Sequence, residues 1–138
     1  MKIDGSCLCG LITYEATINP ERTVLCHCMD CQITSGSAFR WVAPVRAEHF
    51  RLTGGQPKIY VKTADSGAKR ALAFCAECGT HLYGSDVVDT KSYTVRLATA
   101  RQAKQLRPAL QIWRGSALGW LKDIDTFTSF DGQPPARG

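Results

Sequence analysis

The sequence has no apolar run approaching the ~20 residues that a membrane-spanning helix needs. Its first residues, 1–6, also lack the basic stretch followed by an apolar one that marks a secretory signal. We therefore expect a soluble protein of the cytoplasm, where reducing conditions keep cysteines as thiols.

Runs of one charge are absent too. Lys and Arg outnumber Asp and Glu by 17 to 12, a formal net charge of +5, but they are scattered along the chain. A dispersed basic surface is typical of a solvated face, so nucleic-acid binding is not expected. If the seven cysteines held two Zn²⁺ ions as thiolates, seven negative and four positive charges would lower the net charge from +5 to +2. We expect a small-molecule partner and no membrane, and the sequence leaves the oligomeric state open.

Helical periodicity is scarce, and the pattern present in its place is that of short strands. Period-two segments rich in β-branched and aromatic residues alternate with Gly, Pro and Asn turns, at a spacing typical of antiparallel strands. They span residues 11–17, 39–45, 58–62, 71–74, 92–98 and 109–113. We predict a mainly β fold, with a single domain over 1–130 and a flexible tail over 131–138.

Two short helical turns are predicted within this β framework. One spans 28–34 and stops at Gly36. In the other, over 116–122, Ser116 would cap the turn and its leucines would face inward. The tryptophans are expected to pack in the core: Trp41, Trp113 and Trp120.

The most informative residues are seven cysteines in three tight clusters. The clusters are Cys7-Leu8-Cys9, Cys26-His27-Cys28-Met29-Asp30-Cys31 and Cys75-Ala76-Glu77-Cys78. A disulfide within a Cys-x-Cys pair would close a strained ring, and disulfides would leave one of the seven thiols over. Paired cysteines in a reducing compartment are more often metal knuckles or redox centres. We favour metal binding, with redox chemistry or inert cysteines as the alternatives.

Seven thiolates suit one closed structural zinc site with four ligands and one open site with three. Cys9 and Cys78 each precede a glycine, which tolerates the turn that presents two sulfurs to one ion. The structural zinc would join the N-terminal strand to the strand near residue 74. Its ligands are predicted to be Cys7, Cys9, Cys75 and Cys78. The alternative is a pair of unconnected thiol turns.

The remaining cysteines, Cys26, Cys28 and Cys31, are spaced to converge on one face of a loop that enters a helical turn. Zinc held by three thiolates carries a net negative charge, which favours binding an incoming thiol as thiolate over generating hydroxide. A closed structural site completed by His27 or Asp30 remains an alternative. An iron–sulfur cluster normally needs four cysteines.

Other polar residues near the clusters have weaker signals. Ser35 and Ser37 follow the cysteine triad and could donate hydrogen bonds to a ligand, although the same stretch also suits a helix end before a strand. His49 and His81 are isolated in the sequence, and we do not expect them to be ligands.

Three sequence blocks resemble the glutathione-dependent formaldehyde-activating enzyme (GFA) family, which includes centromere protein V. The blocks are Gly5-Ser6-Cys7-Leu8-Cys9-Gly10 with Tyr14-Glu15, Cys26-His27-Cys28-x-x-Cys31-Gln32 with Gly36-Ser37-Ala38-Phe39, and Phe74-Cys75-x-x-Cys78-Gly79-Thr80. They occur in the family's order and span most of the chain. The resemblance implies coiled β-sheets, a four-cysteine structural zinc and a three-cysteine catalytic zinc. One departure is Gln111, which stands where the family commonly has a histidine.

The resemblance also implies an activity. The chain would be a zinc-dependent carbon–sulfur lyase that joins glutathione, or another thiol, reversibly to formaldehyde to give S-hydroxymethylglutathione. Two Zn²⁺ per chain would be the cofactors, glutathione a co-substrate, and Cys26, Cys28 and Cys31 the catalytic residues. The alternatives are a non-enzymatic zinc module that binds protein or nucleic acid, and a zinc–thiolate redox sensor.

A glutathione site would also need cations for two carboxylates. Arg40, Lys69 and Arg70 are the candidates nearest the cysteine blocks. We predict Ser35, Ser37 and Arg40 as substrate contacts beside the three-cysteine site.

Overall fold

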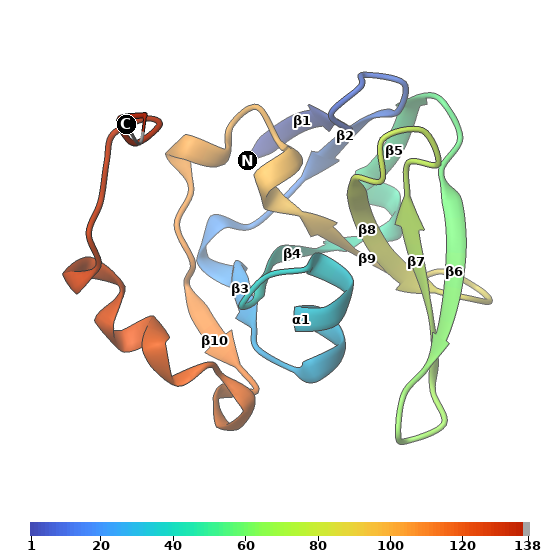
Figure 1. Cartoon of the computed structure of the whole chain (residues 1–138). Coiled ribbons are helices and arrows are strands. Elements are labelled where there is room, and N and C mark those ends of the chain that lie inside the picture. The colour runs from blue at the N-terminus through green and yellow to red at the C-terminus, as the bar shows by residue number, and fades with distance from the viewer. Residues whose placement is uncertain (137–138) are drawn as a thin grey trace.

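The computed structural model describes residues 1–136 and shows two β-sheets, one α-helix and several 3-10 turns (Figure 1). One sheet has the strand order β1-β2-β5, and the other has the order β10-β3-β4-β9-β8-β7-β6. The strands are β1 (Lys2–Ser6), β2 (Thr13–Thr17), β3 (Val24–Cys26), β4 (Arg40–Arg46), β5 (Phe50–Gly54), β6 (Lys58–Thr63), β7 (Lys69–Phe74), β8 (His81–Asp86), β9 (Ser92–Arg96) and β10 (Leu110–Ile112). The mainly β prediction is confirmed. Residues 137 and 138 of the tail predicted over 131–138 lie outside the described residues.

Neighbouring strands pair antiparallel, except that β10 and β3 are parallel. Leu110 lies opposite Val24, and Ile112 lies opposite Cys26. A parallel partner can be reached only by a crossover, which here comprises residues 27–109. The C-terminal part of the chain therefore returns to the sheet edge beside the strand that carries Cys26.

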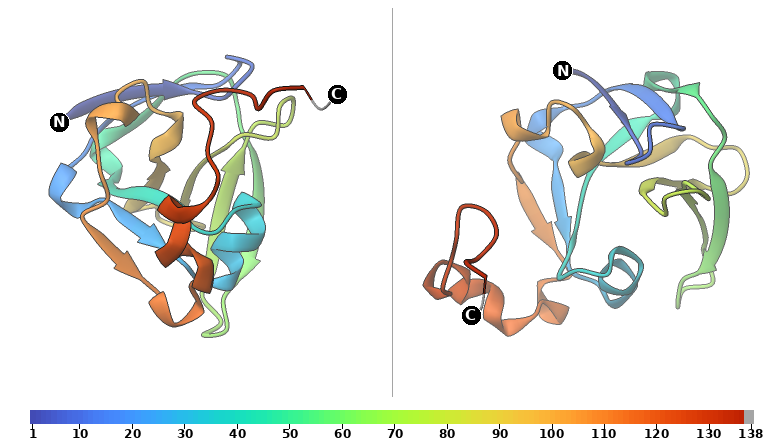
Figure 2. Two further views of the ribbon diagram at one scale, coloured as in Figure 1. Left: turned by 60° about the vertical axis from the view of Figure 1, so that its left-hand side comes forward. Right: turned by 45° about the horizontal axis from the view of Figure 1, so that its top comes forward.

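The core lies between the two sheets (Figure 2). Residues two apart on a strand face it together, as the pleat requires: Tyr14 and Ala16 on β2, and Ala43 and Val45 on β4. The buried residues include Ile3, Tyr14 and Ala16 of the three-stranded sheet and Ala43, Val45, Ala73 and Val95 of the seven-stranded sheet. Phe50 joins the two layers, because its ring centroid lies 4.3 Å from that of Tyr93 and 4.9 Å from that of Tyr83.

The helix α1 (Met29–Ser35) packs on the other face of the seven-stranded sheet, which we call the helix-covered face. Lys62 donates to Asp30 of α1 at 2.7 Å, and Arg40 donates to Thr34. Arg40 is three positions from the core residue Ala43, and Lys62 pairs with Arg70, which is three positions from the core residue Ala73. Both basic residues therefore lie on the face opposite the core. The predicted turn over 28–34 is confirmed, and its end at Gly36 is confirmed as well.

Four of the ten strands were not predicted: β1, β3, β5 and β8. β3 is three residues long, and β8 carries Gly84 and Ser85 in a continuously buried stretch, so neither alternates clearly. β10 and β2 are shorter than the predicted segments 109–113 and 11–17.

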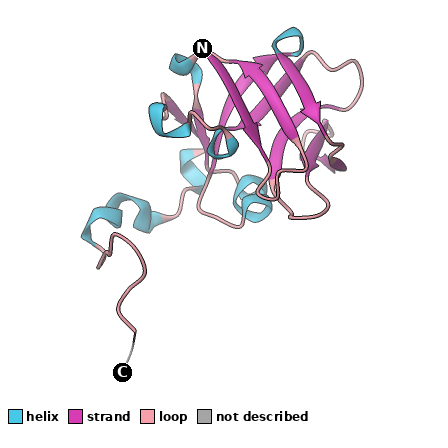
Figure 3. Ribbon diagram, turned by 90° about the horizontal axis from the view of Figure 1, so that it is seen from above, coloured by secondary structure: helices cyan, strands magenta, loops and turns pink. Residues whose placement is uncertain are grey.

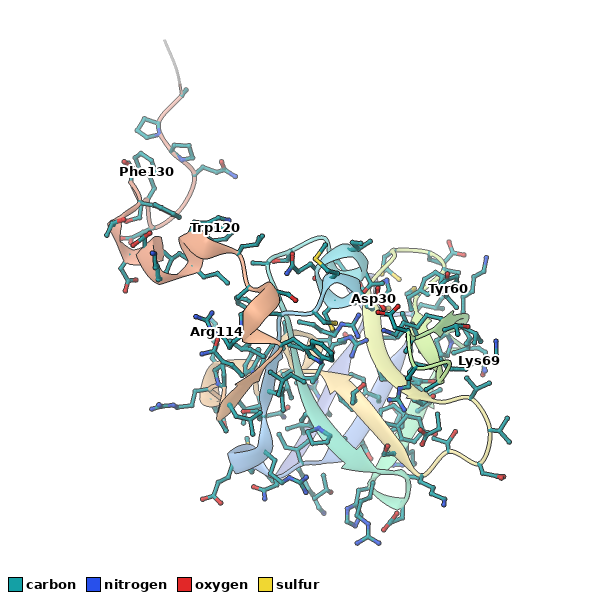
Figure 4. The ribbon with its side chains drawn as sticks, turned by 90° about the horizontal axis from the view of Figure 1, so that it is seen from below. Asp30, Tyr60, Lys69, Arg114, Trp120 and Phe130 are labelled. Carbon is teal, nitrogen blue, oxygen red and sulfur yellow. The ribbon has the colours of Figure 1, made fainter. Side chains whose placement is uncertain are left out.

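The C-terminal prediction needs correction. A 3-10 helix covers Gly119–Thr126, Ser116 makes no cap, and Leu118 is exposed. Trp113 is 66% exposed and Trp120 is 45% exposed, so neither lies in the core. The segment that carries Trp120 and Phe130 stands away from the sheets (Figures 3 and 4). Because this segment stands away from the sheets, its apolar side chains, such as Trp120 and Phe130, stay exposed.

Among residues 1–136, no helix combines the length and the apolarity needed to cross a bilayer.

Candidate metal centres

The structure brings four distant cysteines together at one end of β1 and β7. Cys7 and Cys9 lie in the β1–β2 turn, and Cys75 and Cys78 lie in the β7–β8 turn. All four sulfurs lie within 4.8 Å of one another, with 3.6 Å between Cys7 and Cys9 and 3.8 Å between Cys9 and Cys75. Zinc at 2.3 Å from each of four tetrahedral sulfurs requires sulfur–sulfur separations of about 3.8 Å. The donor set and its spacing therefore fit a closed zinc site.

The backbone builds this four-cysteine group with two similar turns. The Gly10 amide donates to the Cys7 carbonyl at 3.1 Å, and the Gly79 amide donates to the Cys75 carbonyl at 2.8 Å. Both glycines have a left-handed φ, +81° and +76°, which only glycine adopts at little cost. The Ile12 amide also donates to Cys7 Sγ at 3.3 Å. The sulfurs are thus held in place by main-chain hydrogen bonds before any ion is considered.

Thr80 joins the two turns. Its hydroxyl lies 3.1 Å from Cys78 Sγ and accepts from the Leu8 amide at 3.1 Å. The hydrogen bond from Thr80 is the largest of the effects that lower the pKa of Cys78 to about 5. The thiolate form, which is the form that binds metal, is therefore favoured at neutral pH.

The second group comprises Cys26, Cys28 and Cys31, whose three sulfurs also lie within 4.8 Å of one another. Cys26 ends β3, Cys28 precedes α1 and accepts from the Cys31 amide at 3.3 Å, and Cys31 lies in the first turn of α1. A hydrogen bond from the Cys31 thiol is the main reason that the pKa of Cys26 falls to about 5. The same bond raises the pKa of Cys31. One thiolate is therefore already stabilised in this group.

The structure does not favour the closed version of this site. His27 is 1% exposed, but its Nε2 atom lies 2.8 Å from Gln111 Oε1 and its ring packs edge-on against Phe39. The Asp30 carboxylate is occupied by Lys62. Among residues 1–136, neither side chain joins the three sulfurs within 4.8 Å. His49 and His81 also lie outside both groups.

The predicted substrate contacts surround α1. Ser35 Oγ donates weakly, at 3.4 Å, to the carbonyls of Gln32 and Phe39, and Ser37 is exposed. Arg40 lies directly across from Cys26 in the β3–β4 register, so the two side chains share one face of the sheet. The structure thus places Arg40 beside the three-cysteine group.

The other two candidate cations are farther along the same sheet. Arg70 donates to Asp86 at 2.7 Å, so its charge is paired. Lys69 is exposed on the part of the sheet that carries Tyr60 (Figure 4). Neither side chain is adjacent to Cys26 in the sheet register.

Two supporting residues were given no role by the sequence. Gln32 Nε2 donates to the His27 carbonyl at 2.8 Å and to the Ser116 carbonyl at 2.9 Å, which ties α1 to the C-terminal segment. Arg96, the last residue of β9, is 6% exposed. The block Cys31-Gln32 signalled the first, whereas nothing in the scattered basic residues distinguished the second.

A hollow of about 620 Å³ lies on the three-stranded sheet, lined by residues that include Lys2, Glu15 and Arg51. None of the seven cysteines lines it. We therefore assign the thiolate chemistry to the cysteine groups and not to this hollow.

Two packed sheets that carry one four-cysteine and one three-cysteine group define a cysteine-rich β domain whose cysteine groups could each hold a metal ion. The family model for the glutathione-dependent formaldehyde-activating enzyme matches residues 2–116, and the chain belongs to this family.

Two individual proteins are similar to the chain, one in sequence and one in fold. The chain is 32% identical over 79 residues to a Podospora anserina protein named "Putative glutathione-dependent formaldehyde-activating enzyme". The match covers 56% of this chain and 36% of that protein, so the chain spans about a third of its relative's length. A crystal structure of a Rhodobacter sphaeroides protein is similar in fold, with a TM-score of 0.61 and 18% identity, over 78% of this chain and 98% of that one.

Proposed function

We propose that the chain is a zinc-dependent carbon–sulfur lyase acting on a thiol–aldehyde adduct, with glutathione as the thiol and formaldehyde as the aldehyde. One observation carries the proposal: a group of three converging cysteines that neither His27 nor Asp30 completes, in a member of the GFA family. A closed structural zinc needs four protein ligands, whereas three leave a position for a substrate sulfur.

Cys26, Cys28 and Cys31 would hold the catalytic ion, and Cys7, Cys9, Cys75 and Cys78 would hold the structural one. Zinc bound by the three cysteines would supply a Lewis-acidic position that keeps an incoming thiol in its thiolate form. The proposed cofactor content is two Zn²⁺ per chain. The proposed location is the cytoplasm, because both groups require reduced thiols.

In the forward reaction the thiolate sulfur would form a bond to the aldehyde carbon. The carbonyl electron pair would move to oxygen, which takes up a proton, so that a proton passes in net from sulfur to oxygen. The reverse reaction breaks the carbon–sulfur bond and releases thiol and aldehyde. His27 Nε2 is engaged by Gln111, so the proton would be exchanged with water and not with this nitrogen.

The chain's own residues would bind and orient the adduct. Arg40 lies across from Cys26 and would provide positive charge for an anionic group. Ser35 and Ser37 flank Gly36 at the exposed end of α1. The long bonds of the Ser35 hydroxyl to main-chain carbonyls are weak enough to be exchanged for bonds to a ligand.

The experiment is exchange NMR on ¹³C-labelled formaldehyde and glutathione, in which the adduct and the free aldehyde give separate signals. We expect the zinc-loaded protein to accelerate exchange above the uncatalysed rate. Cys28→Ser should abolish the acceleration, whereas Met29→Leu, at an exposed neighbouring position, should retain it. Exchange at the uncatalysed rate with fully zinc-loaded protein would reject this substrate pair.

A further inference from the structure

Arg96 is a buried cation without a carboxylate partner. Its side chain is 6% exposed. Nη1 donates to the Thr94 carbonyl at 3.1 Å, but Nη2 is buried without a hydrogen-bond partner. Among residues 1–136, no Asp or Glu forms an ion pair with it. A buried charge of this kind is unfavourable unless a negative charge nearby offsets it.

The sheet register shows where that negative charge lies. Cys26 is opposite Arg40, and Val42 is opposite Arg96. Because Arg40 and Val42 are two residues apart on one strand, all four side chains share the helix-covered face. Arg96 is thus separated from the three-cysteine group by one strand.

Two further basic residues of this face are paired with carboxylates. Lys62 is bound by Asp30, and Arg70 is bound by Asp86, each at 2.7 Å. Arg40 and Arg96 are the two guanidinium groups left without a carboxylate on the part of this face that borders Cys26. Burial and the neighbouring Arg40 lower the pKa of Arg96 to about 9, and the thiolates of Cys31 and Cys26 act in the opposite direction. Arg96 is therefore charged at neutral pH.

The net charge around the three-cysteine group depends on the fourth ligand. Three thiolates around Zn²⁺ carry a net charge of −1, and the two guanidinium groups carry +2. A neutral fourth ligand leaves this buried region with a surplus of one positive charge. A fourth ligand with one negative charge makes the region neutral, so the positive charge of Arg96 and Arg40 is fully balanced.

We propose that Arg96, together with Arg40, makes the three-cysteine site selective for an anionic fourth ligand, so that it binds a thiol as thiolate in preference to a neutral donor. This inference rests on the proposed function, because it concerns the ligand position of the proposed catalytic ion. Arg96 touches neither the substrate nor the reacting atoms and is a positioning residue.

The test compares two probes on the full-length protein loaded with Co²⁺. 2-Mercaptoethanol binds as a thiolate and has no second anionic group, whereas imidazole is a neutral donor, and both change the visible spectrum of Co²⁺. We expect Arg96→Gln to weaken 2-mercaptoethanol binding by about tenfold and to leave imidazole binding unchanged. Arg96→Lys should retain the preference of the wild type, because it keeps the charge.

Arg70→Gln is the matched control. It removes a positive charge from the same face, but one that Asp86 already neutralises, so the ratio of the two affinities should stay at the wild-type value. If Arg96→Gln does not fold, Arg40→Gln at the half-buried position tests the same charge balance. Equal weakening of both probes, or an unchanged ratio in the variant that folds, would overturn the inference.

The proposed function can fail independently. A wild-type protein that prefers thiolate but does not accelerate adduct exchange would retain this inference and lose the assigned reaction. If Arg96→Gln accelerates exchange as well as the wild type does, and its ratio of the two probe affinities is unchanged, only this inference fails.

Discussion

His27 Nε2 lies 2.8 Å from Gln111 Oε1, which joins the loop between two site cysteines to the C-terminal strand β10. The amide oxygen accepts from Nε2, so the ring proton lies on that nitrogen and Nδ1 is buried without a partner. The resemblance to the GFA family implied a histidine at position 111. The amide of Gln111 reaches His27 from the parallel strand, next to the pairing of Ile112 with Cys26.

We expect Gln111→Ala to destabilise the fold. The change leaves the His27 ring without its hydrogen-bond partner, and an unsatisfied buried polar group costs about 1–3 kcal/mol. Urea unfolding of the zinc-loaded protein measures the effect. Gln105→Ala, at an exposed glutamine, is the control and should be near neutral. Equal stability of the two variants would show that the His27–Gln111 bond contributes nothing.

Thr80→Val should weaken the four-cysteine site while keeping its shape. The substitution removes the hydroxyl that lowers the pKa of Cys78 and that accepts from the Leu8 amide. Partners of metal ligands typically contribute about 10–100-fold in metal affinity. Competition with a chromophoric chelator measures this change. Thr126→Val, whose hydroxyl bonds within the exposed C-terminal segment, should leave the affinity unaltered; loss of affinity in both variants would refute the assignment to Thr80.

Stability should depend on pH through His81. Its ring stacks on Phe74, and burial lowers its pKa below 6.5, with Arg96 and Arg40 acting in the same direction. The unfolded chain therefore binds the proton more tightly than the folded chain. The stabilising contribution is complete above pH 6.5 and is lost as the pH falls toward the lower pKa of the folded state.

The expected result is a smaller loss of stability in His81→Gln than in the wild type between about pH 7.5 and about pH 5.5. Unfolding midpoints at both pH values give the difference, and zinc release affects both proteins alike. His49→Gln is the control, at an exposed histidine. Parallel pH dependences of His81→Gln and the wild type would contradict the role of burial at this position.

Local patterns predicted the parts of the structure that local chemistry determines. Composition and alternation predicted β4 and β6 to within one residue at each end, because both strands are rich in β-branched and aromatic residues. The cysteine spacings separated the four-cysteine group from the three-cysteine group because each knuckle is a single turn. Gly10 and Gly79 have the positive φ expected of such turns.

These local patterns could not predict contacts between distant segments. Arg96 follows Val95 with the alternation of an ordinary strand, and a strand's outer face is usually solvated. Arg96 is nevertheless 6% exposed, and this local pattern gives no sign of that burial. Trp113 has the composition of a core residue but belongs to a segment that leaves the body, so the expectation that it lies in the core was wrong.

The most direct test is the zinc content per chain of protein purified without chelator, measured by elemental analysis for the wild type and for Cys28→Ser. We expect two zinc ions in the wild type and one in Cys28→Ser with the fold retained, since Cys28 belongs to the three-cysteine group. Cys75→Ser should unfold the protein, because Cys75 is fully buried in the group that joins the β1–β2 and β7–β8 turns. One zinc ion in the wild type, or unfolding of Cys28→Ser, would contradict a separate three-cysteine site.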